Sequence, residues 1–268
     1  MIQPTFDPLA PGSAVTLALL GARVGGVLLI APVFSATVVP RAVKVGVLVV
    51  LTVLLQPAAL ASVRNVPQIT PATLLSETVI GLAIGLGAAI VVAAAEAAGD
   101  VMAIQIGLSG AAILDPLDSS QTPVLGSFSR LFAIAILLSL NLLPVMLGAI
   151  ADSAQAFPVG SPVSLANGVG VMVQTGSALF ILGARFAAPV IAAVLIANVA
   201  MAVLGRAAPQ INVLAVAFPV QILLGLLTLA AAIPAMGHLM GGWAAISDGM
   251  LGQVVRALAP AGAPLGVR

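Results

Sequence analysis

The sequence predicts an all-α protein of the integral-membrane type, and three observations lead to this fold class. The composition is 61% hydrophobic and only 6% charged, whereas soluble domains carry roughly 25% charged residues. Apolar runs near the length of about 20 residues that a membrane helix needs recur along the chain. No segment has the composition of a soluble domain. We therefore expect about six long apolar helices and one broken or re-entrant segment.

The first three apolar runs predict helices over residues 13–34, 45–60 and 72–98. Pro32 and Pro40 close the first run, because proline cannot continue a helix without losing a hydrogen bond. The third run is rich in glycine and carries carboxylates inside its apolar sequence, so we expect it to pack against protein as well as to span.

Residues 99–129 interrupt the apolar pattern. They hold three carboxylates and two prolines, which are Asp100, Asp115, Asp118, Pro116 and Pro123. A lipid-facing backbone could not tolerate this segment, because unpaired N–H and C=O groups in hydrocarbon cost several kcal/mol each. The segment must sit in water, pack inside protein or line an aqueous path. Residues 101–114 are too short to span and fit a re-entrant or broken helix.

The last three runs predict helices over residues 124–150, 169–204 and 213–236. The middle one is long for a single span and contains Arg185 and Pro189, which favours a kink or a tilted helix. The tail beyond this region is weakly amphipathic and is expected to fray.

Several charged side chains lie within or at the ends of the apolar runs, where an unpaired charge is expensive. They are Arg23, Glu77, Glu96, Arg185 and Arg206. Glu77 and Glu96 are separated by roughly 28 Å of helical rise, so they cannot share a proton or ion site. Structural ion pairs, within or between subunits, are the favoured reading. Gly81 and Gly85 predict a small-residue face for close helix packing, either inside the chain or against another subunit.

Other function classes lack support in the sequence. There is no cysteine, and His238 is the sole histidine, so no metal-ligand set is recognisable. No nucleophile–base pair or nucleotide-binding motif is present, and we expect neither an enzyme nor a cofactor. The net charge of +1 gives no nucleic-acid signal.

Across most of its length the sequence resembles the FliR/SctT family of flagellar and type III secretion export-gate proteins. The motifs that carry the resemblance are Arg23 with Pro32 and Pro40–Arg41; Glu77 with Gly81 and Gly85; Ala98–Gly99 with Gln105, Gly107 and Leu108; Asp115–Pro116 with Pro123–Val124–Leu125; Ser153 with Phe157–Pro158; Ala188–Pro189; and Arg206-Ala-Ala-Pro209-Gln-Ile-Asn212. Their order and spacing favour the flagellar branch.

The resemblance implies a non-enzymatic subunit that joins FliP and FliQ in a cone-like export gate of the basal body. The gate would sit in the bacterial inner membrane, largely raised on the periplasmic side, open toward FlhA and FlhB, and pass unfolded flagellar subunits. Residues 13–165 would be FliP-like, residues 166–237 a FliQ-like helix pair, and residues 238–268 a tail. The near absence of aromatic residues, 3% of the chain, fits helices buried by subunits rather than by lipid.

The resemblance also assigns residues to roles. Residues 106–126 would form the loop that plugs the closed channel, with the gate residues Ile106, Gly107, Leu108, Gly110, Ile113, Leu114, Asp115, Pro116 and Pro123. Helix packing or subunit contact would involve Glu77, Gly81, Gly85, Arg185, Arg206, Pro209 and Asn212. A stand-alone transporter of small solutes or ions remains the alternative, because broken helices and intramembrane charges would serve it equally well.

Overall fold

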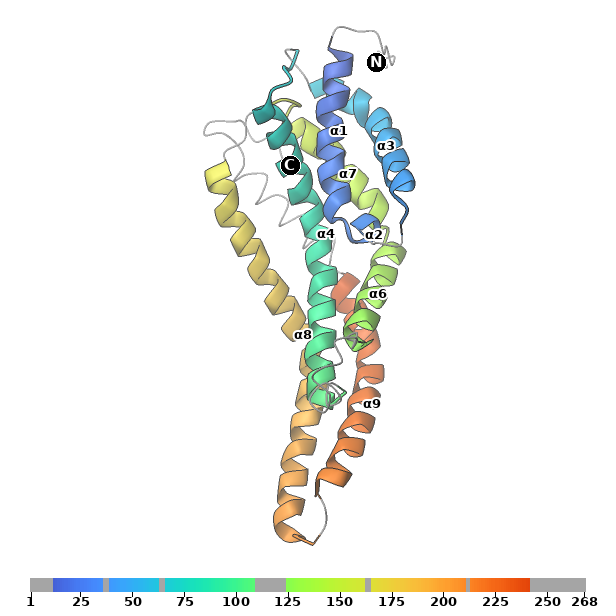
Figure 1. Cartoon of the computed structure of the whole chain (residues 1–268), viewed down its shortest axis with the longest axis vertical. Helices are drawn as coiled ribbons and strands as arrows, with labels where there is room; N and C mark the ends of the chain where they lie inside the picture. Colours follow the sequence, from blue (N-terminus) through green and yellow to red (C-terminus); the bar gives the residue numbers. More distant parts are fainter. Residues whose placement is uncertain are drawn as a thin grey trace. The chain divides into compact units, whose positions relative to one another are not determined.

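The computed structural model describes residues 12–35, 39–62, 66–108, 124–161, 165–210 and 213–241, all of which are helical or connect helices (Figure 1). The all-α prediction is thereby confirmed. The helices are α1 (Ser13–Ile30), α2 (Pro32–Ser35), α3 (Arg41–Ser62), α4 (Pro71–Ile106), α6 (Val124–Ser139), α7 (Leu142–Ala156), α8 (Leu165–Ala207) and α9 (Val213–Gly241).

Five of the described helices are long and apolar enough to cross a membrane: α1, α3, α4, α8 and α9. The pair α6 and α7 would make a sixth span if it counts as one, although it is bent by 70°. The expectation of about six apolar helices with a broken segment is therefore confirmed. The bend between α6 and α7 is a break that the sequence did not predict, and residues 109–123 of the predicted re-entrant segment lie outside the described residues.

Two boundary predictions are wrong. Helix α4 is continuous through Ile106, so residues 101–106 extend the third helix instead of starting a separate short one. Residues 124–150 form two helices, because α6 ends at Ser139 and Asn141 adopts a left-handed φ of 61° before α7. Pro144 falls in the first turn of α7, where its missing N–H costs nothing, whereas a continuous helix would have to accommodate it in the interior.

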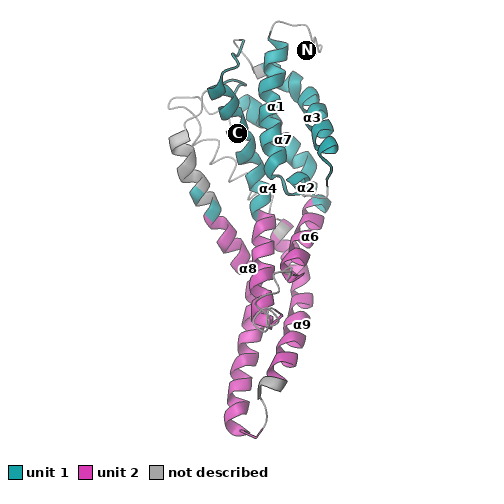
Figure 2. Ribbon diagram, viewed as in Figure 1, with its two compact units in different colours: residues 1–90, 138–176, 243–268 teal, residues 91–137, 177–242 magenta. Residues whose placement is uncertain are grey.

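The chain divides into two compact units (Figure 2). Unit 1 comprises residues 1–90, 138–176 and 243–268, and unit 2 comprises residues 91–137 and 177–242. Helices α4 and α8 each contribute to both units. The resemblance divides the chain at residue 165 by likeness to FliP and FliQ, not by compactness. The compact units therefore do not test that division, and it stays a prediction.

Within unit 1, α1 packs against α4 with almost no side chain between the two backbones. A Cβ built on Gly81 would collide with the carbonyl oxygen of Arg23, and one on Gly26 would lie 2.5 Å from the carbonyl oxygen of Thr78. A Cβ on Gly85 would lie 2.9 Å from the carbonyl oxygen of Val27. Gly81 and Gly85 therefore serve helix packing inside the chain.

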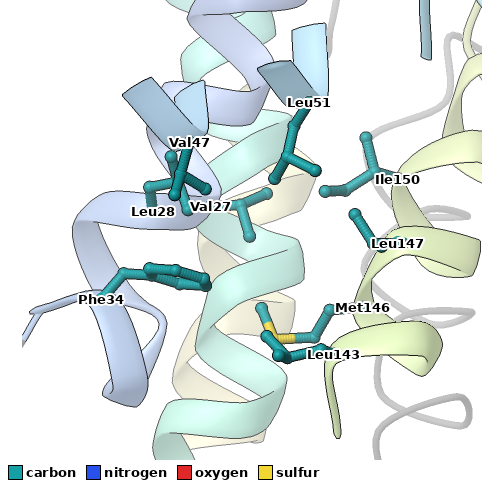
Figure 3. A pocket seen from close by; sticks show the side chains of 9 residues that line it. All are labelled: Val27, Leu28, Phe34, Val47, Leu51, Leu143, Met146, Leu147 and Ile150. Carbon is teal, nitrogen blue, oxygen red and sulfur yellow. The ribbon is translucent and has the colours of Figure 1, made fainter. Parts of the chain in front are cut away.

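Unit 1 also contains an apolar cavity of about 210 Å³ between α1, α2, α3 and α7 (Figure 3). Its lining residues carry only aliphatic, aromatic or thioether side chains: Val27, Leu28, Phe34, Val47, Leu51, Leu143, Met146, Leu147 and Ile150. The cavity offers no hydrogen-bonding side chain, so it has no feature of a polar substrate site.

Candidate functional site

The first candidate site is the point where the chain leaves α4 for the predicted gate segment. The N–H of Leu108 donates to the carbonyl oxygen of Ala103 at 3.0 Å, and the N–H of Gly107 donates to that of Ile104 at 3.1 Å. Gly107 has a φ of 86°. This pair of bonds with a left-handed glycine is the Schellman motif, which ends a helix and fixes the direction of the following chain. The conformation at Gly107 and Leu108 therefore fixes how the chain leaves α4.

The end of α4 at Ile106 and Gly107 is packed within unit 2. Ile106 is completely buried, and a Cβ on Gly225 of α9 would contact its side chain, so the glycine makes room for the isoleucine. The aromatic ring of Phe218 approaches the Gly107 position within 3.3 Å of a Cβ built there. Leu108 is 43% exposed. Ile106 thus acts as an anchor in this structure, while Leu108 is the first residue of the segment that faces outward.

Beyond the predicted gate segment, α6 contacts α4 at Gly99 and Asp100, eight and seven residues before Gly107. A Cβ on Gly99 would lie 2.5 Å from the carbonyl oxygen of Leu125 and 2.8 Å from the Cα of Gly126, so α4 and α6 cross almost backbone to backbone. A Cβ on Gly126 would collide with the carboxylate of Asp100. The described residues on the two sides of residues 109–123, Leu108 on one side and Leu125 with Gly126 on the other, therefore both lie at one stretch of α4, residues 99–108.

Two polar groups at this crossing have no hydrogen-bond partner among the described residues. They are Oδ1 of Asp100 and Oγ of Ser129, both removed from solvent. One turn away, Nε of Arg130 lies 3.9 Å from Oε2 of Glu96, with both side chains partly exposed.

The second cluster lies in unit 1 and centres on Arg23, whose side chain has no exposed surface. Its Nε donates to Oε2 of Glu77 at 2.6 Å, its Nη1 to Oγ of Ser153 at 3.1 Å, and its Nη2 to the carbonyl oxygen of Phe157 at 3.0 Å. Oε1 of Glu77 accepts the N–H of Gly160 at 2.8 Å. The network ties α1, α4, α7 and the turn after α7 together.

The structure separates the predicted residues into groups. Gly110, Ile113, Leu114, Asp115, Pro116, Pro123 and Asn212 lie outside the described residues. Glu77, Gly81 and Gly85 lie together in unit 1 at the α1–α4 contact. Arg185, Arg206 and Pro209 lie in unit 2 with exposed side chains. Their assigned roles in gating and subunit contact stay predictions.

Sequence reasoning did not foresee two of these arrangements. It quoted Arg23, Glu77, Ser153 and Phe157 as separate motifs, and only the structure brings them into one network. It treated Gly99 and Asp100 as part of the interruption and did not predict that Gly126 packs on them. Pairs of residues that meet across such sequence distances leave no local pattern, although a buried arginine demands a partner.

Among the described residues, no three histidine, cysteine or carboxylate side chains lie close enough to hold a metal ion.

Similarity to known proteins shows the family to which the chain belongs. The family described as bacterial export proteins, family 1, matches residues 14–245 of the chain. The chain belongs to this family. Its relatives include the flagellar biosynthetic protein FliR of Escherichia coli K12, 29% identical over 215 residues that cover 79% of this chain and 82% of the relative.

FliR of Caulobacter vibrioides is 27% identical over 80% of this chain and 86% of its own length. FliR of Bacillus subtilis is 32% identical over 54% and 58%. The chain is thus a FliR-family export protein of flagellar biosynthesis, and its apolar helices are those of a membrane protein. Both clusters described above fall inside the matched region.

Proposed function

We propose that this FliR-family protein is a non-enzymatic subunit of the flagellar export gate, that it assembles with FliP and FliQ, and that the loop formed by residues 106–126 plugs the closed pore. The observation that carries the proposal is the double anchorage on α4. The Schellman motif at Gly107 fixes one end of the segment, and the Gly99–Gly126 crossing fixes the other. A loop whose flanking residues are both held on one helix can close a channel and still move aside.

The exposed surface supports assembly. The most apolar windows of α3 and α9 are each only 17% buried inside the chain, and that of α8 is 28% buried. So much apolar surface needs lipid or protein around it. With 3% aromatic residues the chain lacks the usual interfacial belt of a lipid-facing bundle, which favours coverage by neighbouring subunits.

In this proposal residues 13–165 resemble FliP, residues 166–237 supply a FliQ-like helix pair, and residues 238–268 form a tail. The assembled core stands in the bacterial inner membrane within the basal body, largely raised on the periplasmic side. FlhB and FlhA lie at its entrance, and unfolded flagellar subunits are its cargo. Leu108 and the residues after it would provide a hydrophobic constriction that excludes water and ions.

Deletion of residues 110–119 tests the plug. The variant is co-expressed with FliP and FliQ, and we expect the mass of the purified complex to fall only by the deleted residues. Ion flux through the complex in liposomes should rise, because the constriction is gone while the anchors remain. Leu131→Ala, an exposed position on α6, serves as the control and should leave the flux unchanged.

A deletion complex as tight to ions as the wild type would remove the plug from the proposal. A wild-type chain that purifies alone or as a homodimer and shows saturable solute uptake in vesicles would instead favour the stand-alone transporter.

A further inference from the structure

The apolar cavity of unit 1 has a buried floor and a more exposed rim (Figure 3). The floor consists of side chains that are at most 8% exposed: Val27, Leu28, Met146 and Ile150. The rim consists of side chains that keep part of their surface exposed: Phe34, Val47, Leu51, Leu143 and Leu147. The cavity therefore leads from the surface of the unit into its core, which distinguishes its residues from the apolar positions that are simply exposed on the helices.

Water is a poor occupant of this cavity. A buried water molecule needs two to four polar partners, and no lining side chain offers one. An engineered apolar cavity of about 150 Å³ stays dry and binds benzene or xenon, and this cavity measures about 210 Å³. Protein interiors leave few voids larger than a water molecule, because the atoms around a void lose dispersion contacts. We therefore expect the cavity to hold an apolar ligand.

The volume restricts this ligand to a thin one. An α-helix is about 10 Å across with a pitch of 5.4 Å, so a single turn occupies roughly 400 Å³, about twice the volume of the cavity. A helix of another subunit can cover the rim but cannot enter. An alkyl chain fits, and the most apolar window of the neighbouring α3 is only 17% buried inside the chain, so hydrocarbon around the protein can reach the rim.

A cation lies beside the cavity on the same wall. Lys44, Val47 and Leu51 follow one another in steps of three and four residues, which places them on one face of α3. Val47 and Leu51 line the cavity, so Lys44 lies about one turn before it. No carboxylate occurs between Asp7 and Glu77, so α1, α2 and α3 bring no acid to this end. An ammonium group has three donors, and the contact that Lys44 already makes leaves donors for an oxygen anion.

We propose that the cavity binds one acyl chain of a membrane phospholipid and that Lys44 binds the phosphate group of this lipid. Lysine is a common ligand of phosphate, and basic side chains beside membrane helices bind lipid head groups. The lipid is held by two unlike contacts, with hydrocarbon in the cavity and an ion pair beside it. Neither contact requires FliP or FliQ, so the inference does not depend on the proposed function.

The test uses the full chain purified from membranes with whichever subunits accompany it. The protein is reconstituted in vesicles of phosphatidylglycerol and phosphatidylethanolamine that contain a trace of phosphatidylglycerol with a photoreactive diazirine on one acyl chain. Extraction in detergent removes loosely bound lipid before irradiation. We expect the retained probe to form adducts with the floor residues Met146 and Ile150, detected by mass spectrometry of peptides. An unlabelled floor overturns the proposal, whether the cavity is empty or filled by a neighbouring subunit.

A matched pair of variants tests the place of the acyl chain. Leu147→Trp should lower the yield of floor adducts about tenfold, because the larger side chain takes room that the alkyl chain needs. Val50→Trp introduces the same side chain on α3 at a position that is 64% exposed and does not line the cavity, and it should leave the yield unchanged. Equal yields from the two variants would show that the probe labels unit 1 from outside the cavity.

The phosphate contact is tested separately. Lys44→Gln should lower the yield of retained probe about tenfold, which is the loss expected for one hydrogen bond to a charged group. Lys44→Arg keeps the charge and should keep the yield near that of the wild type. A Lys44→Gln protein that retains the probe as well as the wild type overturns the assignment of the phosphate to Lys44.

Discussion

At the scale of single residues, the Arg23–Glu77 pair decides how unit 1 holds together. Both side chains are fully buried, and each uses its remaining hydrogen-bonding groups on α7 or on the turn after it. Buried ion pairs add little net stability relative to an apolar pair, but the loss of one partner is severe because an uncompensated charge stays behind. The network therefore acts as a constraint that admits one arrangement of three helices.

Replacing one member of the pair tests this constraint. Arg23→Met leaves the carboxylate of Glu77 buried with only the Gly160 N–H as a partner, and we expect a loss of about 3–5 kcal/mol of stability. The double variant Arg23→Met with Glu77→Gln should recover a large part of this loss, because no charge remains and the amide oxygen can still accept the Gly160 N–H. Thermal unfolding of the purified complex measures both.

The matched control is Arg41→Met, which makes the same substitution at an exposed position and should change the midpoint little. A single Arg23→Met variant that unfolds at the same temperature as this control would show that the pair does not hold unit 1.

The same residues show what sequence can and cannot tell at this scale. The rule that a charge in an apolar run needs a partner correctly marked Arg23 and Glu77. It could not say that they pair with each other, because 54 positions separate them and pairing depends on how α1 and α4 are laid side by side.

At the scale of elements, glycine sets the distance between helices. Gly26 and Gly81 let α1 and α4 touch backbone to backbone in unit 1, and Gly99 and Gly126 do the same for α4 and α6 in unit 2. The glycine-rich pattern indicated close packing from the sequence alone. The sequence did not indicate which helix packs on these glycines, because a small-residue face looks the same whether it contacts the same chain or another subunit.

Gly81→Ala tests the first of these contacts. The new methyl group would collide with the carbonyl oxygen of Arg23, and neither backbone can yield without moving a helix. We expect a loss of a few kcal/mol, within the range of overpacked cores. Gly46→Ala on α3 is the control, because nothing lies within 4 Å of the added methyl and alanine favours a helix by about 1 kcal/mol.

Equal unfolding midpoints for the Gly81→Ala and Gly46→Ala proteins would contradict the close contact of α1 and α4. A lower midpoint for Gly81→Ala alone, measured by thermal unfolding of the purified complex, is the expected result.

Helix boundaries were the least predictable feature of the elements. The apolar run over residues 124–150 gave no sign of a break, since hydropathy stays high throughout it. The break depends on Asn141 in a left-handed conformation and on Pro144 in the next turn, and either residue alone is compatible with a continuous membrane helix.

At the scale of the whole molecule, the two compact units share helices. Helix α4 supplies residues up to Ile90 to unit 1 and the rest to unit 2, and the boundary falls within an uninterrupted helix. Composition does not change at this point, so the sequence offered no linker by which to find it. The contacts that flank the proposed gate segment, at Gly107 and at the Gly99–Gly126 crossing, both lie in unit 2.

The close contact of Gly99 with α6 can be tested by the ion leakage of the assembled complex. Gly99→Ala places a methyl group 2.5 Å from the carbonyl oxygen of Leu125 and 2.6 Å from Oγ of Ser129, so α6 must shift where the gate segment returns. We expect the complex with FliP and FliQ to form. Ion leakage through it should rise severalfold, because the shift of α6 displaces the proposed plug from its wild-type position. Liposome flux measurements on the purified complex report this change.

Gly148→Ala on α7 provides the comparison, because no atom lies within 4 Å of the added methyl group, and its complex should stay as tight as the wild type. Leakage from Gly99→Ala at the level of Gly148→Ala would mean that the position of residues 109–123 does not depend on the α4–α6 crossing. The plug would then have to be held by the neighbouring subunits alone, and the anchorage on α4 would serve folding only.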